Sequence, residues 1–313
     1  MRSKAVDRAT IVPAFLRPGG RVVVAAPSGV VDKRRLRAGL SYLERMGHPA
    51  RLAPGVLSRH GYLAGTDERR ASAFNAIIAS DATQAVFFAR GGYGIGRILD
   101  RLDLAALRRK PRSLLGYSDL TALFMALQCG SSYLVHYGPV VSELGNRESF
   151  DEASLWGALY GDPAAFDLPF RNKDILRPGR AAGRLIGGCL TLLVSLLGTR
   201  HDPDYAGALL FWEEIGEPPY RIDRMLTQLR SAGKLRRLRG MVVGSLTGCR
   251  AQGREATLPL RRVILDACRD TTFPIIWNVP VGHVKHKRTL PLGLPAVLDT
   301  SARSLRVRRP RGR

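Results

Sequence analysis

Short apolar runs alternate with amphipathic segments through the first half of the chain. The runs are rich in Val, Leu, Phe and Ala and end at Gly, Pro or a polar residue, which is typical of buried strands. Between them, apolar residues recur every three or four positions, as on one face of a helix. The expected strands are 21–26, 85–89, 113–115 and 132–141, and the expected helices are 36–46, 66–78 and 98–102. This alternation predicts an α/β fold with a parallel sheet covered on both faces.

A second unit with the same alternation follows residue 180. Its expected strands are 184–188, 208–212, 241–244 and 275–279, and its expected helices are 190–197, 220–229 and 261–268. The polar stretch between the units is broken by Pro163, Pro169 and Pro178, as in a connection between domains. The sequence therefore predicts an N-terminal α/β domain over 11–145, a connection over 146–180 and a C-terminal β/α domain over 181–308.

One serine stands at the bend between an expected strand and an expected helix. The apolar run ends at Gly116, Ser118 follows, and an amphipathic run begins at Leu120. A hydroxyl there lies beside the first free N–H groups of the helix, whose positive end stabilises an alkoxide or an oxyanion. Ser before Asp at a helix start is also a common N-cap. Ser118 is therefore either a nucleophile or a cap.

A glycine-rich turn, from Arg90 to Gly96, directly follows the expected strand 85–89. Its spacing fits neither the dinucleotide pattern nor the phosphate loop. Glycines at a strand end let a ligand approach bare N–H groups, although a merely tight turn uses them as well. Because ligands bind beyond the carboxyl ends of parallel strands, the turn and Ser118 should be neighbours. The amides of Gly92 and Asp119 are the candidate oxyanion donors.

A serine nucleophile needs a base that is oriented by an acid. The chain has six histidines: His48, His60, His136, His201, His283 and His286. His283 comes just after an apolar strand, so rigid backbone places its ring. His286 ranks second, because neighbouring cations lower its basicity, and His48, His60 and His201 are expected in solvated loops. Glu213 directly follows an apolar strand and is the candidate acid.

Composition and charge change this interpretation little. The net charge of +23 favours polyanions and acidic small substrates, yet it comes from 42 arginines against seven lysines, spread along the chain as in a compositional bias. Four cysteines (Cys129, Cys189, Cys249 and Cys268) lack metal-type spacing, so no metal or cofactor is expected. The sequence shows no signal-peptide core or membrane-spanning run, and reduced thiols suit the cytoplasm.

Five ordered motifs resemble those of the LD-carboxypeptidase family of serine peptidases. They are Arg90-Gly91-Gly92-Tyr93-Gly94, Gly116-Tyr117-Ser118-Asp119, Gly187-Gly188, Phe211-Trp212-Glu213-Glu214 with Tyr220-Arg221-Ile222-Asp223-Arg224, and Gly282-His283 with Leu290-Pro291-Leu292-Gly293. The resemblance runs from about residue 11 to 308. It implies a flavodoxin-like N-terminal domain and a swivelling C-terminal β/α domain, usually in a homodimer. It also implies Ser118 as nucleophile, His283 as base and Glu213 as acid, with an oxyanion hole from the Gly92 and Asp119 amides.

Two positions depart from the pattern of the family that the chain resembles. Cys189 follows the Gly-Gly pair where members often have Asn, and Tyr137 precedes Gly-Pro where many have His. Together with Gly91 and Tyr93, these residues are expected on the substrate side. The departures therefore bear on ligand preference more than on catalysis.

The resemblance implies a metal-independent, cytoplasmic serine carboxypeptidase. It would remove the terminal D-amino acid from a murein tetrapeptide during cell-wall recycling, without membrane or nucleic-acid partners. An alternative within the same family is an immunity peptidase that cleaves a peptidyl-nucleotide antibiotic. A third hypothesis is a basic nucleic-acid-binding protein without catalysis, which would bind with a steep salt dependence. The basic runs lack interleaved aromatic residues, which argues against it.

Overall fold

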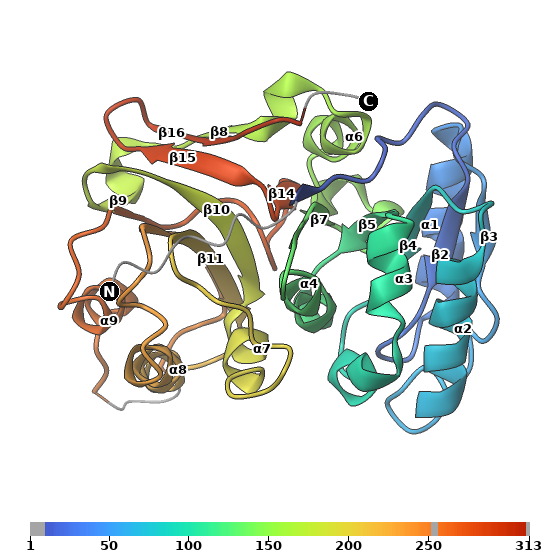
Figure 1. Cartoon of the computed structure of the whole chain (residues 1–313), viewed down its shortest axis with the longest axis horizontal. Coiled ribbons are helices and arrows are strands. Elements are labelled where there is room, and N and C mark those ends of the chain that lie inside the picture. The colour runs from blue at the N-terminus through green and yellow to red at the C-terminus, as the bar shows by residue number, and fades with distance from the viewer. Residues whose placement is uncertain (1–9, 252–255, 311–313) are drawn as a thin grey trace.

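The computed structural model describes residues 10–251 and 256–310, which form two lobes that lie side by side. The N-terminal lobe runs from blue to green and the C-terminal lobe from yellow-green to red (Figure 1). Each lobe contains one large sheet, and strand β14, late in the chain, lies between them. A short parallel ribbon of β1 (Thr10–Ile11) and β6 (Ser132–Tyr133) pairs the start of the described chain with the N-terminal lobe.

The N-terminal sheet has six strands in the order β14-β7-β5-β4-β2-β3. Their bounds are β2 (Val22–Ala25), β3 (Ala50–Leu52), β4 (Ala85–Phe88), β5 (Ser113–Gly116), β7 (Val135–Tyr137) and β14 (Leu290–Leu292). All neighbours are parallel except β14, which pairs antiparallel with β7. Without β14, the strands from the first half of the chain are ordered 2-1-3-4-5, which is the flavodoxin-like order. The predicted flavodoxin-like fold is confirmed.

Helices join these strands as the apolar spacing predicts. Their bounds are α1 (Lys33–Arg45), α2 (Asp67–Ala79), α3 (Leu104–Arg109), α4 (Thr121–Leu127), α5 (Val141–Leu144) and α6 (Glu152–Tyr160). The Thr66 hydroxyl accepts a hydrogen bond from the Arg69 N–H and so caps α2. Leu36 and Leu43, two turns apart on α1, are both buried in the core. Local capping and the apolar stripe together explain where these helices begin and which face they bury.

The C-terminal sheet has eight strands in the order β8-β16-β15-β10-β11-β12-β13-β9. Their bounds are β8 (Asp167–Pro169), β9 (Ile175–Arg177), β10 (Arg180–Cys189), β11 (Ala208–Ile215), β12 (Gly240–Thr247), β13 (Ile275–Ile276), β15 (Pro295–Asp299) and β16 (Ser304–Val307). The four central strands β10 to β13 are parallel, and the strands outside them pair antiparallel. The accompanying helices are α7 (Leu190–Ser195), α8 (Pro219–Ser231) and α9 (Leu260–Ala267). The second unit is therefore a β/α domain, as expected.

Several elements differ from the expected pattern. The segment 146–180, expected as a connection, contains helix α6 and the edge strands β8 and β9. Trp156 of α6 donates from its ring N–H to the Tyr42 hydroxyl of α1 at 2.7 Å, so α6 packs on the N-terminal lobe. Residues 98–102 contain one short 3-10 turn (Leu99–Arg101) rather than an α-helix, and 132–141 divides into β6, β7 and the start of α5. Long-range packing decides these elements, and the local sequence carries little signal for it.

Candidate active site

Ser118 lies at the carboxyl end of β5, in a backbone conformation that is rare for a residue with a side chain. Its φ is +66°, and it begins a 3-10 turn (Ser118–Leu120) that leads into α4. Neither that turn nor α4 has a side-chain cap, so Ser118 is not the N-cap that it could have been. A strained serine on a strand-to-helix turn is the geometry that exposes a nucleophilic hydroxyl.

The glycine-rich turn lies directly against Ser118, as predicted. A Cβ added to Gly91 would lie 3.0 Å from the Ser118 Cβ and 3.2 Å from its Oγ, so a larger residue there would press on the Ser118 side chain. Gly92 follows with a φ of +98°. The Asp119 carboxylate accepts a hydrogen bond from the Ile95 N–H at 2.9 Å and thereby ties the nucleophile turn to the glycine-rich turn. Burial raises the pKa of the Asp119 carboxyl above its ordinary value.

Glu213 and His283 form a hydrogen-bonded pair. The Glu213 carboxylate is completely buried, and its Oε2 accepts from His283 Nδ1 at 2.8 Å and from the His283 backbone N–H at 3.1 Å. Two bonds to one oxygen hold the imidazole with Nδ1 protonated and leave Nε2 free to accept a proton. This is the arrangement of acid and base in a serine hydrolase.

A bulge in β11 separates the roles of the two adjacent glutamates. The strand continues through Ile215, so Glu213 and Glu214 lie within it rather than after it, and its register with β12 shifts between Trp212 and Glu214. Glu214 accepts from the Thr191 N–H and hydroxyl, both at 2.8 Å, at the start of α7. Burial raises the pKa of Glu214. The bulge thus aims one carboxylate at His283 and the other at α7.

Tyr137 connects the nucleophile to the acid. Its hydroxyl donates to Glu213 Oε1 at 2.7 Å and accepts from the Ser118 N–H at 3.3 Å. The Tyr137 side chain is completely buried, and Cys189 is 4% exposed with its thiol toward Glu214. Both therefore lie behind the acid rather than on the surface, and a direct contact of either with substrate stays a prediction. The bridging role of Tyr137 has no signal in the sequence.

The His283 ring packs against the residue that precedes Ser118 in the chain. The Tyr117 and His283 ring centroids are 4.7 Å apart, and Tyr117 immediately precedes Ser118. The Ser118 hydroxyl and the His283 ring do not hydrogen-bond each other in the described structure, so a direct Ser118–His283 contact stays a prediction. Catalytic hydrogen bonds are commonly long in the free enzyme and tighten when substrate binds.

The comparisons with known proteins decide the family. Family models for the LD-carboxypeptidase N-terminal and C-terminal domains match residues 22–138 and 182–298. The chain is 38% identical to a putative carboxypeptidase of Streptomyces coelicolor, covering 97% of this chain and 98% of that one. The chain belongs to the LD-carboxypeptidase family. It is also 35% identical to the murein tetrapeptide carboxypeptidase of Pseudomonas aeruginosa, covering 90% of this chain and 93% of that one.

A solved structure shares the fold of this LD-carboxypeptidase. The microcin C7 self-immunity protein MccF superposes with a TM-score of 0.87, covering 96% of this chain and 98% of that one. The two sequences are 20% identical, so this likeness bears on the fold alone. As a member of its family the protein is a serine-type carboxypeptidase.

An ion pair between a buried lysine and a partly buried glutamate flanks the candidate site of the LD-carboxypeptidase. Lys287 Nζ lies 2.8 Å from Glu143 Oε1 and 4.8 Å from the centre of the Tyr117 ring. The Tyr117 hydroxyl donates to the same Glu143 oxygen at 2.7 Å. Lys287 follows His283 on one loop, while Glu143 and Tyr117 belong to the N-terminal lobe. The pair therefore fastens the loop that carries the base to the lobe that carries the nucleophile.

The remaining histidines lie away from this cluster. His286, ranked second, is exposed and makes no contact with Glu213, and His60 is exposed as expected. His48 was expected to be solvated and is not: it is completely buried, stacks on Trp156 at 5.1 Å and hydrogen-bonds the Tyr160 hydroxyl at 2.7 Å. His201 is also partly buried and lies 2.7 Å from Asp100. Polar neighbours in sequence suggested solvent, whereas aromatic residues from α6 cover His48.

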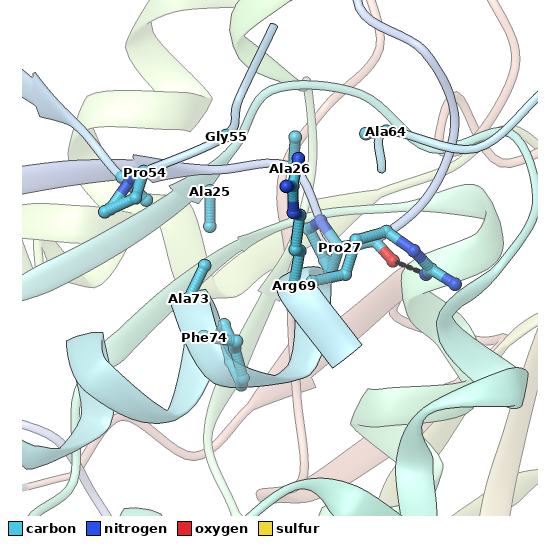
Figure 2. A pocket seen from close by; sticks show the side chains of 11 residues that line it. Ala25, Ala26, Pro27, Pro54, Gly55, Ala64, Arg69, Ala73 and Phe74 are labelled. Carbon is cyan, nitrogen blue, oxygen red and sulfur yellow. Dashed lines mark hydrogen bonds between the residues drawn. The ribbon is translucent and has the colours of Figure 1, made fainter. Parts of the chain in front are cut away.

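Other features of the described chain are not part of the site. No cluster of three or more His, Cys, Asp or Glu suited to a metal ion occurs within residues 10–251 and 256–310. Over the same residues, no helix has the length and apolar character needed to cross a membrane. A small pocket between the end of β2 and α2, lined mainly by alanine and proline, contains none of the candidate catalytic residues (Figure 2).

Proposed function

We propose that this LD-carboxypeptidase hydrolyses the amide bond before a C-terminal D-amino acid, with Ser118, His283 and Glu213 as its catalytic triad. The observation that carries the proposal is the buried Glu213–His283 pair, linked to the Ser118 turn through the Tyr137 hydroxyl. The natural substrate we propose is a murein tetrapeptide, which is the substrate in the name of the Pseudomonas aeruginosa relative.

The reaction follows from the roles of these groups. His283 Nε2 takes the proton of Ser118 Oγ, which attacks the carbonyl carbon of the scissile amide. The Gly92 and Asp119 amides stabilise the oxyanion. His283 then gives the proton to the leaving amine of the D-amino acid, and an acyl-enzyme remains. His283 activates a water that hydrolyses the ester, while Glu213 holds the tautomer and stabilises the imidazolium.

Replacing Ser118 by Ala tests this proposal. The variant should release no D-alanine from a murein tetrapeptide, as followed by mass spectrometry, and should unfold in urea as the wild type does or slightly later. Ser195→Ala is the matched control, because Ser195 is an exposed serine of α7 whose hydroxyl donates to the Leu192 carbonyl of the same helix at 2.9 Å. Turnover by the Ser118→Ala protein at the rate of the control would remove the mechanism.

A second candidate function is immunity against a peptidyl-nucleotide antibiotic. The fold likeness to the microcin C7 self-immunity protein favours testing it. Incubation with an acyl-sulfamoyl adenosine beside the murein tetrapeptide separates the two functions by which compound is cleaved at the higher kcat/KM.

Cellular location, assembly and nucleic-acid binding are further parts of the proposal. We place the protein in the cytoplasm, where its four cysteines, none of which forms a disulfide, stay reduced. We expect a homodimer, which sedimentation velocity would detect. We expect no specific nucleic-acid complex, despite the charge of +23. Tight, salt-dependent binding to duplex or single strands would contradict that expectation.

A further inference from the structure

A hollow opens beside the glycine-rich turn, at the point where the strand order of the N-terminal sheet reverses. It is lined by Gly29, Tyr62, Arg90, Gly92 and Tyr93. Gly29 follows β2 and Gly92 follows β4, and these are the two strands on either side of the reversal. The Gly29 N–H donates to the Gly91 carbonyl at 3.1 Å, which joins the two turns. Ligands in open α/β sheets bind at such a switch point.

Arg90 carries the positive charge of this hollow. Its Nη1 donates to the Val30 carbonyl at 2.7 Å, which holds the exposed guanidinium in place. Its Nε lies 3.6 Å from the position that a Cβ on Gly92 would occupy, so the guanidinium stands over the turn that offers the candidate oxyanion donor. Arg90 forms no ion pair with any residue in 10–251 or 256–310. The remaining N–H groups can therefore bind an anion.

Three other cations on the elements around the site are already paired with carboxylates. Lys287 is buried against Glu143, and Arg70 is buried against Asp67. Lys285 is exposed and pairs with Glu148 at 3.1 Å. A buried charge that has its counter-ion loses that partner if it turns to a ligand, which costs free energy. Arg90, already exposed and unneutralised, binds a carboxylate without such a loss.

We propose that Arg90 binds the α-carboxylate of the terminal D-amino acid. This inference rests on the proposed function and names the group that makes the enzyme act at a free C-terminus. That carboxylate lies about 4 Å from the scissile carbonyl carbon, so its partner must stand close to the oxyanion donors. A guanidinium presents a planar fork that matches a carboxylate with two hydrogen bonds. The exposed Tyr62 and Tyr93, packed edge to face at 5.7 Å, line the same hollow.

Two substrates that differ only at the C-terminus test the inference. The first is the murein tetrapeptide with its free acid, and the second is the same peptide as a C-terminal carboxamide. Wild type should prefer the acid by at least about tenfold in kcat/KM, as one charge-assisted contact provides. In Arg90→Gln, kcat/KM for the acid should fall by about 10- to 100-fold, while kcat/KM for the carboxamide should change by less than about twofold. Arg90→Lys should fall between, because an ammonium cannot form the fork.

A control variant and two contrary results complete the test of Arg90. Arg236→Gln removes the same charge from an exposed position after α8 and should behave as wild type. If Arg90→Gln keeps the wild-type preference for the acid, or loses both substrates equally, Arg90 does not bind the carboxylate.

Binding provides a readout that does not need turnover. In the Ser118→Ala protein, calorimetry should show tighter binding of the acid than of the carboxamide, and adding Arg90→Gln should remove that difference. If wild type cleaves neither peptide, the proposed function fails while this binding comparison still decides the role of Arg90. Equal binding of acid and carboxamide to the Ser118→Ala protein would overturn the inference.

Discussion

Gly282 is the residue at which one added methyl group should separate the acid from the base. Its φ is +105°, a conformation that favours glycine. A Cβ built on it would lie 2.4 Å from Glu213 Oε2, the oxygen that binds His283. Ordinary contact begins at 3.4 Å, so the carboxylate or the loop must move by about 1 Å. The 2.8 Å bond from His283 Nδ1 would then exceed hydrogen-bonding distance.

The magnitude follows from two separate costs. The left-handed backbone costs an alanine about 1 to 2 kcal/mol, and the overpacked contact adds about 1 to 3 kcal/mol. Gly282→Ala should therefore lower the free energy of unfolding by roughly 2 to 5 kcal/mol. Turnover should fall further, by about 10²- to 10⁴-fold, because the imidazole loses the group that holds its tautomer.

Urea unfolding and kcat/KM on the murein tetrapeptide measure the two effects. Gly65→Ala is the matched control, since its φ is +106° and the nearest atom to an added Cβ lies at 3.4 Å. In Gly65→Ala the free energy of unfolding should fall only by the backbone cost, and turnover should stay unchanged. A kcat/KM of Gly282→Ala within about threefold of that of Gly65→Ala would refute the predicted separation, because the added methyl group would then leave the Glu213–His283 pair in place.

Three further substitutions test other parts of the structure. Tyr137→Phe leaves Glu213 Oε1 without its donor and should cost about 1 to 3 kcal/mol in urea unfolding together with about tenfold in kcat; an unchanged kcat would refute the bridge. Lys287→Met leaves the Glu143 carboxylate without its cation and should lower the free energy of unfolding by about 3 kcal/mol. Adding Glu143→Gln should recover part of this loss, and additive effects of the two substitutions would contradict the ion pair. His136 is completely buried, and burial lowers its pKa to about 4, so it is neutral in the fold and takes up a proton on unfolding. The stability that neutral His136 contributes is fully present above the unfolded pKa of 6.5. As the pH falls from 6.5 to about 4, the free energy of unfolding drops by about 1.4 kcal/mol per pH unit. His136→Leu should remove this pH dependence in urea unfolding between pH 7 and 4.5, and an unchanged dependence would contradict the assignment.

The parts of the fold that sequence predicted best are those in which local pattern and burial agree. The runs 85–88 and 113–116 are wholly buried strands, and each is followed directly by a polar turn at the same edge of the sheet. That pattern was enough to place the glycine-rich turn beside Ser118. The positive φ of Ser118 was not predictable, because contacts with Gly91 of the glycine-rich turn and Tyr137 of β7 hold it.

The elements that sequence missed depend on partners far along the chain. The three-residue strand β8 pairs with β16, and Leu168 lies opposite Leu305. Strand β14 crosses to the other lobe to pair with β7. Such short edge strands carry almost no periodicity of their own, so their pairing is settled by the sheet that receives them. Burial of His48 by Trp156 is a contact of the same kind.

The candidate catalytic residues are shared unequally between the two lobes. Glu213 lies in β11, and the loop that carries His283 leaves the same sheet, where the Ser245 N–H of β12 donates to the Val281 carbonyl at 3.0 Å. The acid and the base are therefore preassembled within the C-terminal lobe. Ser118 belongs to the other lobe.

The position of Ser118 relative to His283 consequently depends on contacts between the lobes. Several contacts cross the lobes in the described structure, and three of them lie beside the candidate site: the Tyr137 hydroxyl on Glu213, the Lys287–Glu143 ion pair, and the antiparallel pairing of β14 with β7. Two of them lie on the loop between His283 and β14, so the base is anchored to both sheets. A change in the angle between the lobes should alter the Ser118–His283 distance while leaving the Glu213–His283 bond intact. Turnover should thus be more sensitive than stability to mutations at this crossing, which is the opposite of what a core position would show.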